Sequence, residues 1–105
     1  MDYPPLNYYT DKEGIENYSN PKIVQEKARK YGLEVVYSPR KNKKYRIVNP
    51  ETNKFVDFGS FNPKMQDYTF HQDEDRRQNF LSRNRRFKDA PKYSASWASL
   101  NLLWS

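Results

Sequence analysis

Cysteine is absent from the 105-residue chain, glycine occurs three times and histidine once. Without cysteine the protein can form no disulfide and can use no thiolate as a nucleophile or metal ligand. The glycines are too widely separated to form a loop that cradles phosphate groups. No apolar run approaches the roughly 20 residues that a membrane-spanning helix needs, and the amino terminus lacks the regions of a signal peptide. We therefore expect no membrane span and synthesis in a reducing cytoplasm.

Aromatic residues are abundant in an otherwise polar sequence. Nine Tyr, six Phe and two Trp make up 16% of the residues, while 35% are hydrophobic and 30% are charged. Disordered chains are poor in aromatic residues, and each buried ring removes a large area from water. A chain of this length buries only a modest core. The composition predicts one small folded domain with tyrosine-rich margins.

The amino-terminal part of the chain divides at residue 20. Residues 1–19 show neither helical nor strand periodicity, so we expect an extended arm there. Asn20 and Pro21 suit the N-cap and the first position of a helix. Apolar residues recur at helical spacing over residues 21–31, and Gly32 ends the helix. The predicted organisation is an extended arm over 1–19 and a single α+β domain over 20–105.

Three β-rich segments and a second helical pattern follow. The β-rich segments are residues 33–38, 44–48 and 54–58. Their short polar connections predict a three-stranded antiparallel meander, packed with two or three helices. Three consecutive acidic residues from Asp73 onward favour a helix start, so we expect the next helix to begin near Thr69 or Asp73 and to end near Arg83. An ion pair between Asp73 and Arg77 would support it.

Charge lies in four blocks of alternating sign. The net charge is −3 over residues 1–20, +7 over 21–48, −4 over 49–75 and +6 over 76–105. A protein that only coats phosphate needs no acidic blocks, whereas a protein docked among others can use all four. The pattern favours a protein partner. The simpler alternative is a solvated surface on which like charges cluster by chance.

Two basic clusters are the strongest candidates for a binding site. One lies in a predicted hairpin turn and the other follows the second helix; their cations are Arg40, Lys41, Lys43, Lys44, Arg83, Arg85 and Arg86. Both clusters interleave cations with aromatic residues, as contacts to phosphates and bases require. Arginine and tyrosine are equally favoured at protein interfaces. The clusters therefore predict an anionic partner, either nucleic acid or an acidic protein surface.

The carboxyl-terminal segment contains an apolar stripe. Trp97, Leu100 and Trp104 recur at the spacing of one helix face. The stripe would either complete the core of the domain or insert into a groove on a partner. On the second interpretation Trp97 and Trp104 are docking residues.

Few residues in this sequence are candidates for catalysis or metal binding. His71 precedes three acidic residues and could serve as a general base or a metal ligand. A polar helix start that satisfies backbone N–H groups explains the same residues. The sequence has no nucleophile elbow, no HExxH motif and no zinc-ligand spacing. We therefore predict no enzymatic activity, no cofactor and no metal.

The stretch from Lys44 to Trp104 resembles a family of small basic proteins of nucleocytoplasmic large DNA viruses, of the chlorella virus and giant virus type. The pieces that carry the resemblance, in chain order, are 44–48, 55–59, 67–69, His71, 75–83, 94–97 and 103–104. The first 43 residues add nothing to it. The family has no assigned enzymatic activity, so the resemblance transfers no catalytic residue. It implies instead a fold signature, in which Asp67, His71, Asp75 and Arg77 fix the 60–72 segment against the second helix, and the two tryptophans close the core.

The resemblance implies a viral origin and a place in the virion. The leading hypothesis is a minor structural or cement protein that binds the major capsid protein or other minor capsid proteins, made in the host cytoplasm. A basic protein that binds DNA during genome packaging is the alternative. A third hypothesis is a host-interaction factor that never enters the particle.

Overall fold

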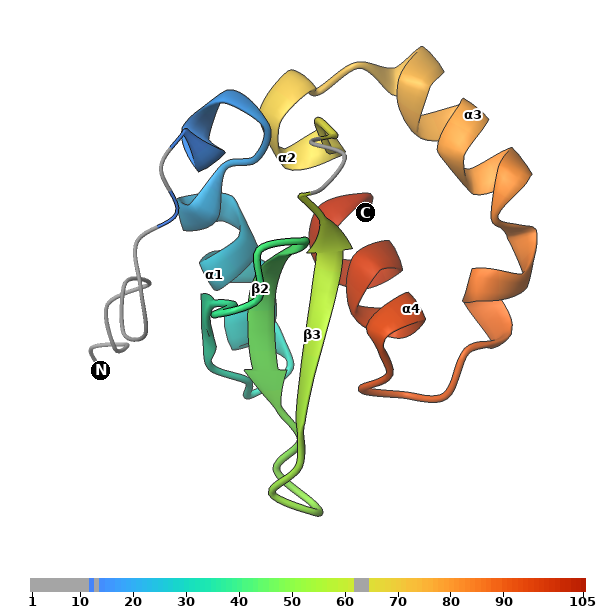
Figure 1. The fold of residues 1–105 in the computed structure, drawn as a ribbon. Helices are drawn as coiled ribbons and strands as arrows, with labels where there is room; N and C mark the ends of the chain where they lie inside the picture. Colours follow the sequence, from blue (N-terminus) through green and yellow to red (C-terminus); the bar gives the residue numbers. More distant parts are fainter. Residues whose placement is uncertain (1–11, 13, 62–64) are drawn as a thin grey trace.

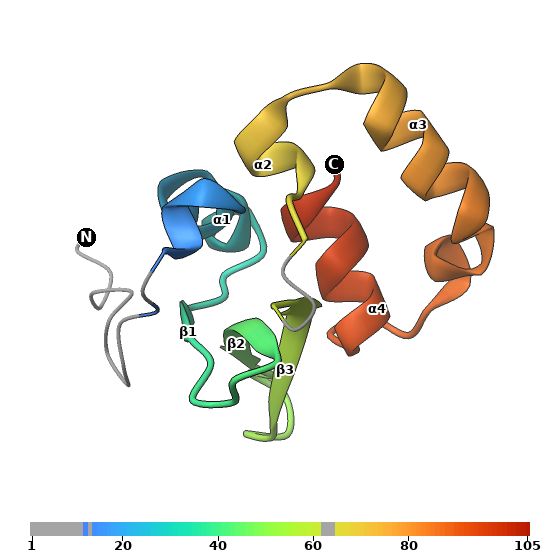
Figure 2. The same cartoon turned by 45° about the horizontal axis from the view of Figure 1, so that its top comes forward.

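A computed structural model describes residues 12, 14–61 and 65–105 and confirms the predicted α+β fold with its three-stranded antiparallel sheet (Figures 1 and 2). The elements in chain order are η1 (Ile15–Asn17), α1 (Pro21–Lys30), β1 (Val35–Tyr37), β2 (Lys43–Val48), β3 (Phe55–Ser60), α2 (Tyr68–His71), α3 (Glu74–Arg83), η2 (Arg85–Asp89), α4 (Ala95–Ala98) and η3 (Ser99–Leu103). Within the described residues, every helix falls short of the length and hydrophobicity that crossing a membrane requires.

Helix α1 forms where its local signals predict it. The side chain of Asn20 accepts a hydrogen bond from the backbone N–H of Ile23, and Pro21 is the first helical residue. Lys30 is the last helical residue, one residue before the predicted end. Gly32 follows with a φ of 71°, the left-handed conformation that commonly terminates helices.

The sheet has the strand order β1-β2-β3, with both pairs antiparallel. Tyr45 of β2 pairs with Phe58 of β3, and both side chains are fully buried. Arg46 pairs with Asp57 on the opposite side of the pleat. Since side chains alternate between the two faces of a strand, this register sends the aromatic pair into the core.

Helices from both ends of the chain complete the core. In Figures 1 and 2, α1 lies against the sheet, and α4 with η3 lies alongside β3. Segments α2, α3 and η2 arc around this carboxyl-terminal helical segment. The core contains the following buried hydrophobic residues: Ile15, Val24, Ala28, Leu33, Val35, Tyr45, Ile47, Phe58, Phe61, Tyr93, Ala98, Leu102, Leu103 and Trp104.

The packed unit begins earlier than the sequence predicts. Residues 14–19 were expected to lie in an extended arm, but they contain the 3-10 turn η1, in which Ile15 is 2% exposed. Ser19 is also buried. The Ile15 side chain packs in the hydrophobic core, so the domain begins before residue 20. The rest of the predicted arm, residues 1–11 and 13, lies outside the described residues.

Where the sequence predicts one further helix, the structure has two. The predicted start near Asp73 and end near Arg83 are confirmed by α3, and the alternative start near Thr69 falls in the separate short helix α2. Asp67 caps α2, whereas Asp73 caps α3. Gln72 lies between them with a φ of 52° and so breaks the helical path. The break redirects the chain, so that α3 runs along the outside of the molecule (Figure 1).

Gly59 allows the sheet and the carboxyl-terminal segment to approach closely. Its φ is 82°, and a Cβ there would lie 3.0 Å from Cδ1 of Leu103 and 3.2 Å from Cβ of Lys44. Both the backbone conformation and the lack of space favour glycine. The contact sets the position of η3 beside β3.

Candidate binding site

Lys44, in the first basic cluster, points into the fold. Its side chain is 2% exposed, and its Nζ donates to Oδ2 of Asp67 at 2.9 Å. Burial lowers the pKa of Lys44, and the Asp67 carboxylate partly offsets this effect. The prediction that Lys44 contacts a partner is therefore wrong, because its charge is neutralised inside the molecule.

The other cations of the first cluster remain accessible to different degrees. Arg40 and Lys41 are exposed in the turn before β2, and Lys43 is half-buried at the start of the strand. The backbone carbonyl of Arg40 accepts a hydrogen bond from Nζ of Lys12 at 2.7 Å. The first cluster thus offers a partner mainly Arg40 and Lys41.

A buried chain of hydrogen bonds continues from the Lys44 ion pair. The Tyr45 hydroxyl donates to Oγ of Ser19 at 2.7 Å, and Ser19 lies 3.1 Å from Oγ1 of Thr69. The Thr69 hydroxyl donates to Oδ1 of Asp67. Burial raises the pKa of Tyr45 well above its ordinary value, so its phenol keeps its proton. The chain joins the segment between η1 and α1 to β2 and to α2, and its role is structural.

Helix α3 owes its start to its acidic residues. The Asp73 side chain accepts hydrogen bonds from the backbone N–H groups of Asp75 at 3.0 Å and Arg76 at 3.2 Å. The predicted ion pair between Asp73 and Arg77 does not form. Arg77 instead pairs with Glu74 at 2.9 Å, because Asp73 is occupied as the N-cap.

The cations of the second cluster face solvent. Arg83 is the last residue of α3, and Arg85 and Arg86 begin η2; all three side chains are exposed. Their guanidinium groups make no ion pair or hydrogen bond within the described residues. Neither α3 nor η2 contains a buried residue. The structure therefore places the predicted cations on one outer segment, α3–η2.

The two tryptophans of the apolar stripe belong to the packed domain. Trp104 is 8% exposed, and Trp97 is half-buried. The Trp97 ring makes edge contacts with the rings of Tyr31 and Tyr93, at centroid distances of 4.9 and 5.3 Å. The interpretation of the stripe as part of the core fits these positions. Neither ring is displayed for insertion into a partner.

Trp104 also attaches α3 to the rest of the molecule. Its ring stacks on Phe80 with a centroid distance of 4.2 Å and an interplanar angle of 1°. Its backbone carbonyl accepts a hydrogen bond from Nε of Arg77 at 2.8 Å. Phe80 makes a further edge contact with Phe87 of η2. Helix α3 is thus held along one side and open along the other.

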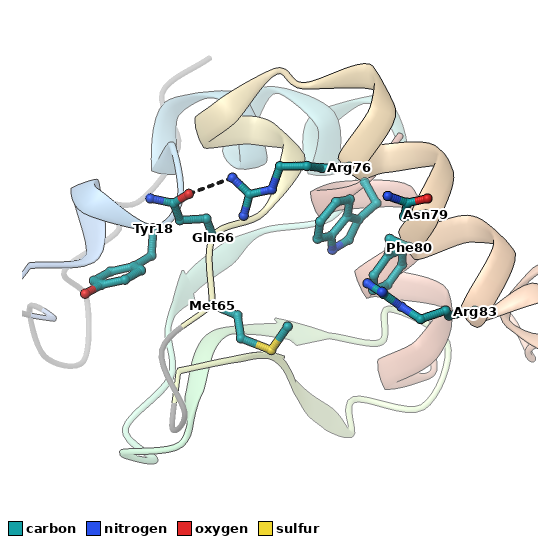
Figure 3. A pocket seen from close by; sticks show the side chains of 8 residues that line it. Tyr18, Met65, Gln66, Arg76, Asn79, Phe80 and Arg83 are labelled. Carbon is teal, nitrogen blue, oxygen red and sulfur yellow. Dashed lines mark hydrogen bonds between the residues drawn. The ribbon is translucent and has the colours of Figure 1, made fainter.

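A cleft of about 420 Å³ lies beside the attached face of α3 (Figure 3). The residues that line it are Tyr18, Met65, Gln66, Arg76, Asn79, Phe80, Arg83 and Trp104. None of the described lining residues is a carboxylate. Gln66 accepts a hydrogen bond from Nη1 of Arg76 at 2.9 Å, which holds this guanidinium at the rim.

Sequence reasoning identified Arg83 but missed Arg76 and Asn79 as members of this site. The signal was present, because positions 76, 79, 80 and 83 have the i, i+3, i+4, i+7 spacing of one helix face. The other side of the cleft comes from distant parts of the chain, and no local pattern predicts that Tyr18 and Met65 face α3.

His71 stabilises the turn between α2 and α3. Its Nδ1 accepts a hydrogen bond from the backbone N–H of Asp73 at 2.9 Å, and its ring lies 5.3 Å from the ring of Trp104. Burial and the Arg76 charge lower the pKa of His71, with Asp67 and Asp73 partly opposing them. Among the residues that the structure describes, no three potential metal ligands lie close enough together to hold a metal ion, with His71 or without it. These contacts match the polar helix start considered above.

The comparison with protein families gives one match. A model described as "Family of unknown function (DUF5754)" matches residues 33–84, the segment that contains the sheet, α2 and α3. Over this segment the chain is similar to that family, and the segment supplies most of the residues that line the cleft. No curated protein matches the chain, and neither does any solved structure.

Proposed function

We propose that the protein is a non-enzymatic structural protein of a large DNA virus particle, where it binds an acidic surface of the major capsid protein or of another minor capsid protein. The exposed cations of segment α3–η2 carry the proposal. Among the described residues, Arg83, Arg85 and Arg86 have no counter-charge, so a partner that supplies carboxylates gains their electrostatic attraction.

The way in which α3 is attached supports a docking role. The helix is fixed to the molecule through Phe80 and Arg77, and both contact Trp104. It therefore presents its remaining surface in a defined orientation. A helix held in a fixed orientation, with an outward cationic surface, suits a protein that links other proteins, because little backbone order must be gained on binding.

The viral part of the proposal is supported by the sequence resemblance over residues 44–104. Several residues of that pattern make the contacts that define this fold. Asp67 caps α2 and neutralises Lys44, and Arg77 binds the Trp104 carbonyl. The pattern is thus a signature of the scaffold that carries α3.

The test is quantitative mass spectrometry on purified virions, separated into shell and DNA-containing core fractions. We expect the protein in the shell, at a fixed ratio to the major capsid protein. Absence from both fractions would contradict the virion role and would favour a host-interaction factor.

A second candidate function is binding of DNA during genome packaging, and one observation favours it. Most carboxylates of the acidic block 49–75 are engaged with other groups of the same chain: Asp57 with Arg46, Asp67 with Lys44, Asp73 as an N-cap and Glu74 with Arg77. The outer surface is therefore more uniformly basic than the sequence suggests. Recovery in the core fraction, with release by salt, would support this function over the first.

A further inference from the structure

The cleft beside α3 combines two separated cations with an apolar floor. Arg76 and Arg83 lie seven positions apart on one face of the helix, so their Cα atoms are separated by about 10 Å along the axis. Phe80, Trp104 and the 48% exposed side chain of Met65 supply apolar surface between them. Figure 3 shows Met65 across the cleft from Phe80 and Arg83.

The two arginines are available to a ligand in different ways. Nη1 of Arg76 is held by Oε1 of Gln66, whose Nε2 in turn donates to the backbone carbonyl of Asn17 at 3.3 Å. This buttress fixes the position of one guanidinium and leaves its other N–H groups for a ligand. The Arg83 side chain has no hydrogen-bond partner among the described residues, and neither has the Asn79 amide between them.

The chemistry of the cleft selects an occupant with two carboxylates and an apolar side chain. An extended peptide of the polyproline II type repeats its side-chain direction every three residues, over about 9 Å. Two acidic residues at that spacing match the separation of Arg76 and Arg83. The Asn79 amide can pair with the peptide backbone between them.

We propose that this cleft binds an extended acidic peptide segment, with one carboxylate on Arg76, a second on Arg83 and an apolar side chain on the floor formed by Met65, Phe80 and Trp104. The inference rests on the proposed docking function and names the chemistry of the partner surface. A protein segment is favoured over nucleic acid, because the Trp104 and Phe80 rings already stack on each other and offer bases little open ring face.

The test is fluorescence anisotropy with the full chain and a fluorescein-labelled peptide, Gly-Ser-Glu-Leu-Pro-Glu-Ser-Gly. We expect saturable binding that Arg76→Gln and Arg83→Gln each weaken about ten-fold, as loss of a charge-assisted hydrogen bond does. Lys22→Gln is the matched control, because it removes the same charge from an exposed residue outside both the cleft and segment α3–η2. Thermal melting establishes that each variant is folded.

Two further peptides and an oligonucleotide define the outcomes. Binding should be lost when both Glu residues of the peptide become Gln, and weakened when its Leu becomes Ser. Equal weakening by Lys22→Gln, or undiminished binding of the Gln peptide, would overturn the cleft assignment. Displacement of the peptide by a single-stranded oligonucleotide at lower concentration would assign the cleft to nucleic acid instead.

The outcome is independent of the virion measurement. A protein found in the shell that fails to bind the peptide through Arg76 and Arg83 keeps its proposed function and loses this site. A protein absent from the particle loses the function, whatever the peptide shows.

Discussion

At the scale of single residues, the buried pair of Lys44 and Asp67 joins β2 to the cap of α2. Asp67 accepts from Nζ of Lys44 at 2.9 Å and from the backbone N–H of Thr69 at 3.0 Å. Removing both ions from water costs free energy that their attraction and hydrogen bonds must offset. The folded protein is therefore less stable with one of the two buried ions alone than with neither of them.

We expect Lys44→Met to lower the free energy of unfolding by about 3–5 kcal/mol, because it leaves the Asp67 carboxylate buried without its counter-charge. The double variant Lys44→Met with Asp67→Asn should recover much of this loss. Urea unfolding measures both values, and Lys43→Met is the neighbouring control. A cost below about 1 kcal/mol for Lys44→Met would place the pair in solvent, where ion pairs contribute that little.

Asp57 makes the stability of the folded protein depend on pH in the acidic range. Burial alone would raise its pKa, but hydrogen bonds from Arg46 and Ser38, with the charges of Arg46 and Arg40, lower the pKa below its ordinary value. A carboxyl whose pKa is lower in the folded state adds stability above its unfolded pKa, about 3.9. That stability disappears as the pH falls through the folded value.

We expect Asp57→Asn to be less stable than the natural chain by about 1–3 kcal/mol at pH 7, because charge-assisted hydrogen bonds are lost. The difference should begin to shrink as the pH falls below the unfolded pKa of about 4, and should close once the pH is below the lowered folded pKa, where a protonated Asp57 resembles asparagine. Thermal unfolding of both proteins between pH 2 and pH 7 measures it. A difference that persists unchanged at pH 2 would contradict the role of the charge.

At the scale of elements, the sequence predicted those helices and strands that are specified by residues close together in the chain. Helix α1 has its cap, its first proline and its terminating glycine next to one another in the chain, so its predicted bounds differ from the observed ones by one residue. The three strands were recovered for the same reason. Alternating apolar residues between polar turns specify a meander without reference to distant residues.

Contacts between distant residues explain what the sequence left unpredicted. Lys44 is buried because Asp67, 23 positions away, accepts its charge. Nothing about Gln72 signals the positive φ that divides the second helix. Of the binding site, the sequence predicted Arg83 and the cationic character of α3–η2, but not the cleft, since its walls come from Tyr18, Met65 and Trp104.

The attachment of α3 depends mainly on one ring. We expect Phe80→Ala to accelerate amide hydrogen exchange throughout α3, because the stack on Trp104 is lost, while the amides of β2 keep their protection. Phe70→Ala is the matched control, since Phe70 is 40% exposed. Hydrogen exchange followed by mass spectrometry resolves the two regions. Equal acceleration in β2 would mean that α3 cannot open separately from the core.

At the scale of the whole molecule, ion pairs within the chain engage several carboxylates, so the charge that remains exposed is mainly positive. The net charge is +6, and the carboxylates of Asp57, Asp67 and Glu74 are paired with cations of the same chain. The cations of α3–η2 that have no ion pair among the described residues then add a positive field at this surface. Such a field mainly accelerates association.

If the proposed capsid partner is correct, replacing Arg83, Arg85 and Arg86 together with glutamine should slow association with the isolated major capsid protein about ten-fold at low salt. The matched control replaces Lys22, Lys30 and Lys54 with glutamine, which removes the same charge from exposed side chains elsewhere on the molecule. Surface plasmon resonance gives both rates. An equal effect of the two triple variants would show that net charge alone matters. If DNA is the partner, the first triple should instead reduce the slope of log K against log salt by about 3 units.

The buried hydroxyl chain has a consequence for the lifetime of the folded protein. Ser19 meets Thr69 across 50 positions and Tyr45 across 26, so these bonds close only after the sheet has brought the segments together. Ser19→Ala should therefore speed unfolding and leave the folding rate nearly unchanged, as stopped-flow kinetics can measure. A slower folding rate would contradict this order of events. Once these hydrogen bonds have formed, they slow unfolding, as the proposed role in a virus particle would require of the protein.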